Sequence, residues 1–179
     1  FGDRSSTWTT RGALNKQFTF DNKNYLPDSM LHTYRHHHTH AAAGFQTSPF
    51  NDATVVVIDA IGEWETISIW YAEYDEKMNA VYKKLWSQKY PHSIGLYYSA
   101  LTHRLGLRPL DEEYIMMGMA AYGNPKRLWK DMYDMFDYVD GADVRYKDNL
   151  HRGCKRWKPE LTTEQDMFDI AAATQKTYE

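Results

Sequence analysis

The apolar run Ala53–Asp59, "ATVVVID", constrains the fold more than any other segment of the chain. It is short, rich in β-branched residues and continuously apolar up to its closing aspartate. Such a run is typical of a strand that is buried on both faces. We therefore expect this segment to be a strand at the centre of the fold, with Asp59 at its carboxyl end.

Two segments with partial alternation of apolar and polar residues follow this run, "ETISIWYAEY" and "MNAVYKKLWSQ". The polar residues Asp75–Lys77 separate them, which predicts an antiparallel hairpin. A tight connection around Gly62 should join the hairpin to the buried strand.

Helices are predicted on both sides of these strands. The first begins at His36 or His37 and ends before Ser48-Pro49, because alanines favour helix and the proline disfavours a helical residue before it. Further helices are expected over 93–106, 111–123 and 125–139, and Thr162 and Gln165 match a capping box that opens a last one. This order indicates an α/β fold, consistent with one half of a ribonuclease-H-like lobe.

Composition excludes some classes of function. The net charge of −3 gives no electrostatic reason to expect nucleic-acid binding. The basic cluster 151–158 is interpreted as a solvated loop in preference to a phosphate-binding or substrate-binding patch. No apolar run approaches the roughly 18 residues of a membrane span, and a single cysteine, Cys154, is compatible with a reducing cytoplasm. The chain starts at Phe1 without Met and stops inside a predicted helix, so we expect residues 1–179 to be a fragment.

Four histidines occupy five positions between His36 and His40. On a helix, His36 and His40 are four residues apart and lie on one face. Two imidazoles placed in this way can bind one divalent cation. The alternative is an ordinary polar helix start with solvated or hydrogen-bonded histidines. His37 and His38 point elsewhere on the helix, and we expect both on the surface.

Asp59 is the best candidate for a third metal ligand. An acidic residue at the end of a buried strand is costly unless it is paired or metal-bound, and ligands often bind beyond such strand ends. The turn that follows, with Gly62, can cradle a phosphate or a metal-bound oxygen. Three other candidates for chemistry are weaker: Cys154 is expected to be a packing thiol, Met116 with its neighbours Met117 and Met119 to be core, and Glu112 and Glu113 to complement a helix amino end.

Two long motifs resemble those of one family. Residues 36–66, "HHHTHAAAGFQTSPFNDATVVVIDAIGEWET", and residues 90–123, "YPHSIGLYYSALTHRLGLRPLDEEYIMMGMAAYG", resemble signatures of the O-carbamoyltransferases of nodulation-factor and antibiotic biosynthesis. The resemblance implies that residues 1–179 are part of an amino-terminal actin-like domain, related to the tRNA threonylcarbamoyl-transfer enzymes. The family's carboxy-terminal domain would lie outside this chain and act as its partner.

The resemblance also implies an activity. Family members use Mg²⁺-dependent chemistry to make carbamoyladenylate from carbamoyl phosphate and ATP in the carboxy-terminal domain. They then transfer the carbamoyl group to the hydroxyl of a small-molecule acceptor in the actin-like domain. A metal, iron in at least some members, is held there by two histidines and two aspartates.

The resemblance also assigns roles to individual residues, by their positions in the family's motifs. His36, His40 and Asp59 match three metal ligands, and the second aspartate and the general base are expected outside this chain. Fe(II) is the expected metal, with Mn or Zn also suited to such ligands. Gly62 and Glu63 match part of the loop that binds the adenylate phosphate. Residues 93–106 and Glu113 would line the nucleotide side.

Two positions depart from the family pattern. Ala60 stands where the family usually has glycine, and Ile115 stands where it usually has lysine. These departures keep open the alternative of a noncatalytic metal-binding or nucleotide-binding module. A tRNA threonylcarbamoyl-transfer relative is a further alternative. Formation of a carbamoylated product would separate an enzyme from a binding module.

Overall fold

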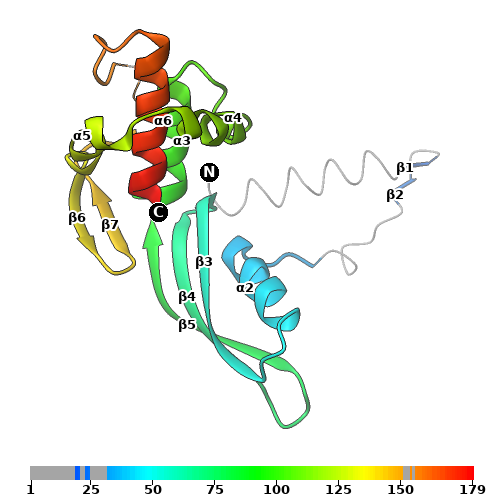
Figure 1. Ribbon diagram of the computed structural model, residues 1–179. Coiled ribbons are helices and arrows are strands. Elements are labelled where there is room, and N and C mark those ends of the chain that lie inside the picture. The colour runs from blue at the N-terminus through cyan, green and yellow to red at the C-terminus, as the bar shows by residue number, and fades with distance from the viewer. Residues whose placement is uncertain (1–18, 21–22, 25–31, 151–153, 155) are drawn as a thin grey trace.

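A computed structural model describes residues 19–20, 23–24, 32–150, 154 and 156–179 (Figure 1). The strands are β1 (Thr19–Phe20), β2 (Lys23–Asn24), β3 (Asp52–Gly62), β4 (Glu65–Tyr74), β5 (Ala80–Lys89), β6 (Phe136–Asp140) and β7 (Asp143–Tyr146). The α-helices are α2 (His36–Gln46), α3 (Ile94–Arg104), α4 (Glu113–Met119), α5 (Trp129–Tyr133) and α6 (Glu164–Tyr178). Figure 1 shows a long curved sheet of β3, β4 and β5 with α2 along it, and the other four helices gathered at one end of the sheet.

The predicted hairpin is confirmed. Strands β3, β4 and β5 pair antiparallel in that order, and the described ladder aligns Val55 with Trp70 and Trp70 with Lys84. In the turn between β4 and β5, one carboxylate oxygen of Asp75 accepts hydrogen bonds from the backbone N–H groups of Lys77 and Asn79. An aspartate that binds the backbone ahead of it in this way favours a tight turn.

The prediction that Ala53–Asp59 is buried on both faces is wrong. Strand β3 lies at an edge of the described sheet, and α2 covers only one of its faces. Val57 on the covered face is 6% exposed, whereas Val56 and Ile58 on the other face are 55% and 54% exposed. A continuously apolar run cannot reveal how many of its faces are covered, because both faces carry the same kind of side chain.

Helix α2 begins at His36 and ends at Gln46, as predicted, and it packs on the sheet through a stripe of residues four apart. His37, Ala41 and Phe45 are each at most 1% exposed. Surface positions were expected for His37 and His38; this expectation is wrong for His37, which is buried, whereas His38 is half-buried. The ring of His38 stacks on Trp70 with 5.4 Å between centroids. His37 is covered because α2 packs against β3 and β4.

The helical part of the chain has a separate core. Helix α3 begins after Ser93, whose side-chain oxygen accepts a hydrogen bond from the backbone N–H of Leu96. It ends in a Schellman motif, with Gly106 at a φ of +81° and the N–H of Leu107 bound to the carbonyl of Thr102. Residues buried in this core come from α3 to α6 and β7; they are Tyr97, Ala100, Leu101, Met116, Leu128, Met132, Val144, Tyr146, Leu150, Ile170, Ala171 and Ala173.

The helix predicted over 125–139 is wrong. Residues Pro125–Arg127 form a single 3₁₀ turn, α5 is five residues long, and Phe136–Asp140 is strand β6, paired with β7. The sequence held a signal for this hairpin, because alternating residues flank Asp140-Gly141 and Gly141 adopts a φ of +58°. The helix expected over 111–123 is also shorter, and its last turn, Ala120–Tyr122, is 3₁₀.

The capping box of the last helix lies one residue later than predicted. Thr163 and Asp166 form it, and Arg127 contacts Asp166 at 2.6 Å and Asp169 at 2.8 Å. Hydrogen bonds from Thr163, and then from Arg127, lower the pKa of Asp166 to about 2. These contacts fix the start of α6 against the segment that precedes α5.

Acid should therefore loosen α6. An unfolded aspartate has a pKa of about 3.9, so the stabilisation from Asp166 is present above that pH and is lost as the pH falls towards 2. Thermal unfolding followed by circular dichroism between pH 6 and pH 2 should show this loss. In an Asp166→Asn variant the pH dependence should be weaker, and an unchanged dependence would contradict the assignment.

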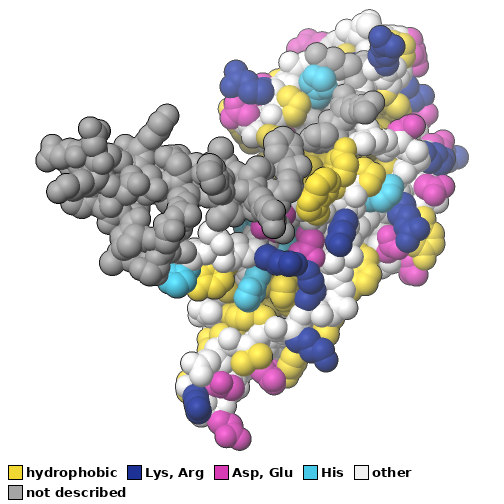
Figure 2. All heavy atoms as spheres, turned by 180° about the vertical axis from the view of Figure 1, so that it is seen from behind, with side chains coloured by type: hydrophobic (Ala, Val, Ile, Leu, Met, Phe, Trp, Pro, Cys, Tyr) yellow, Lys and Arg dark blue, Asp and Glu magenta, His cyan; other side chains and the backbone are white. Residues whose placement is uncertain are grey.

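The surface carries mixed charge. On the face shown in Figure 2, the described Lys and Arg side chains are interspersed with Asp and Glu and form no continuous basic area. Hydrophobic side chains also remain visible between them. Among the described residues, none of the helices combines the length and the apolarity that crossing a membrane requires.

Candidate metal centre

Three of the predicted site residues meet at the first turn of α2. The Nε2 atom of His36 lies 2.8 Å from Oδ2 of Asp59 and 2.9 Å from Nε2 of His40. One ligand atom from each of the three residues lies within 4.8 Å of the other two. The residues predicted to bind a metal come from two elements, α2 and β3, and the structure brings them together.

An irregularity in the sheet aims Asp59 at the helix. The pairing of β3 with β4 shifts register between Ile58 and Gly62, so Asp59 lies where the ladder is interrupted. Such irregularities turn side chains away from the regular alternation. The backbone N–H of Ala60 donates to Oδ1 of Asp59 at 2.7 Å. This leaves Oδ2 for His36.

The three converging atoms suit a cation. A ring nitrogen of histidine carries either a proton or a lone pair in the ring plane, so Nε2 of His36 cannot bond well to both Asp59 and His40. Two atoms that share a tetrahedral Zn²⁺ at about 2.0–2.1 Å lie about 3.3 Å apart. The observed 2.8 and 2.9 Å are close to that separation, and small side-chain movements would reach it.

The cluster is open to solvent. The side chain of His36 is 45% exposed and that of Asp59 is 27% exposed. Catalytic metal sites keep at least one coordination position for water or substrate, whereas structural sites are closed by protein ligands. Two histidines and one carboxylate on an accessible surface therefore fit a metal that also binds a substrate.

Gly62 provides the space for the histidines. A Cβ atom at Gly62 would lie 2.7 Å from Cδ2 of His36 and 2.4 Å from Cδ2 of His37. Both distances are far below ordinary contact, so neither ring could keep its position beside a larger residue. The predicted role of Gly62 was phosphate binding, and the structure adds a contact with the metal-ligand helix.

His37 belongs to the site and was not predicted. Its side chain is 1% exposed, and its Nδ1 atom lies 2.7 Å from Oγ of Ser68 on β4. Burial lowers the pKa of His37, although the nearby carboxylates of Glu65 and Asp59 oppose this change. The sequence held a signal for its burial, because His37 is the first member of the four-residue spacing that continues at Ala41.

A half-buried ion pair lies on the strands beside these residues. Lys84 of β5 contacts the carboxylate of Glu65, and its ammonium group lies 5.3 Å from the ring centroid of Trp70. Burial alone would raise the pKa of Glu65, but hydrogen bonds from Lys84 and Ser87 lower it. Glu65 therefore keeps its negative charge near the histidines.

The predicted nucleotide residues are spread over a wider area. Glu63 is exposed in the two-residue turn between β3 and β4, at a φ of +61°. Glu113 begins α4, and its Oε1 atom accepts hydrogen bonds of 2.6 Å from Oγ of Ser99 and from the backbone N–H of Leu110. These hydrogen bonds lower the pKa of Glu113, although burial alone would raise it. The contacts of Glu113 hold a loop in place, and its nucleotide role stays a prediction.

Glu113 also lines a cavity that reaches the strand beside the metal ligands. This cavity has a volume of about 480 Å³, and its walls include Ala60, Gly95 and Tyr98. A Cβ atom at Gly95 would lie 2.8 Å from Cα of Ala60, so α3 and β3 touch there. Ala60, one of the two departures from the family pattern, is thus a wall residue next to Asp59.

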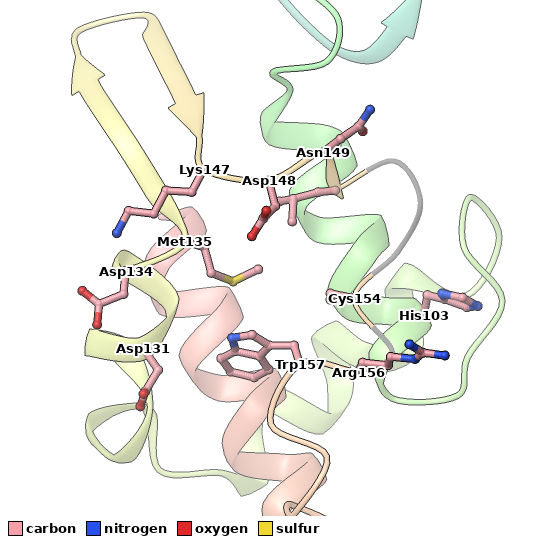
Figure 3. Close-up of a pocket in the computed structure, with 11 residues that line it drawn as sticks. His103, Asp131, Asp134, Met135, Lys147, Asp148, Asn149, Cys154, Arg156 and Trp157 are labelled. Carbon is pink, nitrogen blue, oxygen red and sulfur yellow. The ribbon is translucent and has the colours of Figure 1, made fainter.

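A second cavity, of about 640 Å³, lies in the helical part, away from the predicted site residues (Figure 3). Met135 and Trp157 lie at its centre, with Asp131 on one side and His103 on the other. Cys154 also lines it; burial raises the pKa of this thiol to about 12, in agreement with its prediction as a packing thiol. Of the predicted basic cluster, residues 151–153 and 155 lie outside the described part of the chain.

The sequence of this chain also matches known proteins. Residues 13–178 match the family described as Carbamoyltransferase N-terminus. An uncharacterized protein of Synechocystis sp. is 34% identical over 156 residues, which are 78% of this chain and 25% of the relative. An uncharacterized protein of Methanocaldococcus jannaschii is 34% identical over 164 residues, 82% of this chain and 26% of the relative.

A third relative is named for a role in nodulation. The nodulation protein NolO of Bradyrhizobium diazoefficiens is 31% identical over 110 residues, 62% of this chain and 19% of that protein. The chain thus spans about a quarter of the length of the first two relatives. The family match covers nearly all of the chain, including every predicted site residue. The chain therefore belongs to the carbamoyltransferase amino-terminal family.

Proposed function

We propose that this chain carries the transfer site of an O-carbamoyltransferase, where a carbamoyl group passes from carbamoyladenylate to the hydroxyl of a small molecule. The observation that carries the proposal is the convergence of His36, His40 and Asp59 in a member of this family. Since the chain spans a quarter of its relatives, ATP, carbamoyl phosphate and Mg²⁺ would be used by another domain of a longer protein. We expect the reaction to take place in the cytoplasm.

His36, His40 and Asp59 would hold a divalent metal. Two imidazoles and one carboxylate with open positions suit Fe(II), and Mn or Zn are the alternatives. A bound metal supplies Lewis-acid stabilisation to phosphate oxygens and a template for the reacting groups. The hydrogen bond from Ala60 to Asp59 holds the carboxylate so that Oδ2 faces His36.

The fold supports the proposed actin-like assignment. Three antiparallel strands in sequential order, followed by a helix, agree with the start of a ribonuclease-H-like lobe. Gly62 ends β3 beside the histidines, and Glu63 follows it in the turn to β4. In our proposal the adenylate phosphate binds at this turn, and the cavity along Ala60 and Glu113 takes another part of the nucleotide.

The acceptor is proposed to be a small molecule. The segments "SPF" and "GEWET" favour the nodulation-factor and antibiotic branch of the family, and the similarity to a nodulation protein supports this choice. The mixed surface charge gives no reason to expect nucleic acid as the acceptor. Carbamoylated product formed by a longer protein that contains this chain would separate an enzyme from a binding module.

The first test of this proposal is metal binding. In a longer protein that contains this chain, wild type should bind one Fe(II), or Co(II) as a stand-in, per chain, and each of His36→Ala, His40→Ala and Asp59→Ala should weaken binding at least about 100-fold. Each change removes one of only three protein ligands described here. Anaerobic titration with metal analysis measures the stoichiometry and the affinity.

His103→Ala is the matched control, because His103 lines the distant cavity and should leave metal affinity unchanged. Metal retained at full affinity in all three ligand variants would refute the site. Absence of metal from wild type under anaerobic conditions would refute it as well.

A further inference from the structure

We infer that His37 is a positioning residue of the metal centre, held in one tautomer by Ser68 and Trp70 and seated on Gly62 beside His36. That a metal ligand is positioned rests on the proposed function. That His37 is held in place rests on the geometry of its hydrogen bond. Since His37 does not touch a reacting group, its effect must pass through His36 and Gly62.

A chain of three buried side chains carries the inference. The indole N–H of Trp70 donates to Oγ of Ser68 at 2.7 Å, and the same oxygen lies 2.7 Å from Nδ1 of His37. The exposed fractions are 6% for Trp70, 0% for Ser68 and 1% for His37. Because water cannot reach these groups, the donor and acceptor of one hydrogen bond determine which group donates in the next.

Counting hydrogens assigns the tautomer of His37. The indole nitrogen can only donate, so Oγ of Ser68 accepts from Trp70. The hydroxyl hydrogen of Ser68 then needs an acceptor, and among the described residues Nδ1 of His37 is the one within reach. If Nδ1 accepts, the proton of the neutral imidazole is on Nε2.

The Nε2 end of the ring has no hydrogen bond to any described residue. Within the described part of the chain, Nε2 of His37 is buried without a partner. The ring is therefore held by hydrogen bonding at Nδ1 alone, and Ser68 supplies that contact. Loss of the Ser68 hydroxyl would leave both nitrogens unpaired and the ring free to change its rotamer.

The position of the ring matters because of Gly62. A Cβ atom at Gly62 would lie 2.4 Å from Cδ2 of His37, 2.8 Å from its Nε2 and 2.7 Å from Cδ2 of His36. The rings of His36 and His37 thus both lie close to Gly62, and their centroids are 6.1 Å apart. A shift of His37 would displace the Gly62 turn or the first turn of α2, and either movement would change the approach of His36 to Asp59.

The tautomer can be measured without metal. Long-range ¹H–¹⁵N spectra of the metal-free chain should show His37 with a protonated Nε2 and an unprotonated Nδ1. In Ser68→Ala, Nδ1 of His37 loses the hydroxyl from which it accepts, so a mixture of tautomers is expected. A protonated Nδ1 in wild type would overturn the inference, whatever the metal does.

The positioning role is tested by Co(II) affinity. Ser68→Ala should weaken Co(II) binding about tenfold, the lower end of the range for residues behind metal ligands. Ser68→Thr, which restores a hydroxyl, should recover most of it. Thr102→Ala removes an equally buried hydroxyl from the helical core. It should lower thermal stability but leave Co(II) affinity unchanged, which separates positioning from general destabilisation.

The outcomes distinguish the two proposals. Unchanged Co(II) affinity in Ser68→Ala, with wild type binding through His36, His40 and Asp59, would overturn the positioning role alone. Wild type that binds no Co(II) would overturn the proposed metal site and, with it, the positioning role. If Thr102→Ala loses as much Co(II) affinity as Ser68→Ala, the loss would follow from general destabilisation, and this result would also overturn the inference.

Discussion

A Gly62→Ala variant should bind metal at least about 100-fold more weakly than wild type. The new methyl group would lie 2.4 Å from Cδ2 of His37 and 2.7 Å from Cδ2 of His36, so at least one ring must leave its position. His36 is the residue that contacts both other ligands, and its displacement separates all three. Co(II) titration of the purified variant measures the effect.

Gly118→Ala is the matched control for the effect of replacing a glycine by alanine at a position with free space. A Cβ atom at Gly118 would meet nothing within 4 Å, and the residue lies within α4. Since alanine is a better helix former than glycine, this variant should be neutral or more stable by up to about 1 kcal/mol, with unchanged metal affinity. Wild-type affinity in Gly62→Ala would show that the histidines do not depend on this contact.

The second large effect is expected at Gly123, far from the metal centre. A Cβ atom there would lie 1.9 Å from the carbonyl oxygen of Phe168 and 2.4 Å from its carbonyl carbon. Both are backbone atoms of α6, which cannot move without breaking its own hydrogen bonds. Gly123→Ala should therefore lower the free energy of unfolding by about 3 kcal/mol or more.

Urea unfolding of Gly123→Ala and Gly118→Ala, side by side, measures this difference. The backbone N–H of Asn124 donates to Asp169 of α6 at 2.7 Å, so a displaced Gly123 would also lose this anchor. A change of less than about 1 kcal/mol in Gly123→Ala would mean that α6 can shift to accommodate the methyl group, and the close packing described here would be wrong.

Most elements could be predicted because their signals are local. The alanine run and Pro49 bound α2, and alternation around Asp75–Lys77 indicated the β4–β5 hairpin. The error at 125–139 has a local cause as well. Residues 129–133 are helical, and the apolar spacing continues into Phe136–Asp140, where pairing with β7 and the turn at Gly141 override it.

The candidate ligands could also be found from spacing. His36 and His40 share a helix face whenever the segment is helical, and Asp59 ends an apolar run. The spacing could not show that the ladder is interrupted after Ile58, which turns Asp59 towards the helix. Nor could it show that Ser68 and Trp70, thirty residues away, would bury His37.

By itself, the sequence determined most of the helices and strands, though not β6, and which side chains could bind a metal, because periodicity and spacing act within a few residues. Only the tertiary structure decided that one face of β3 stays exposed and that His37, not His36, is buried. The physical reason is that burial and hydrogen bonding depend on what packs over a residue. For His37, that partner is Ser68 of β4, which lies 31 residues further along the chain.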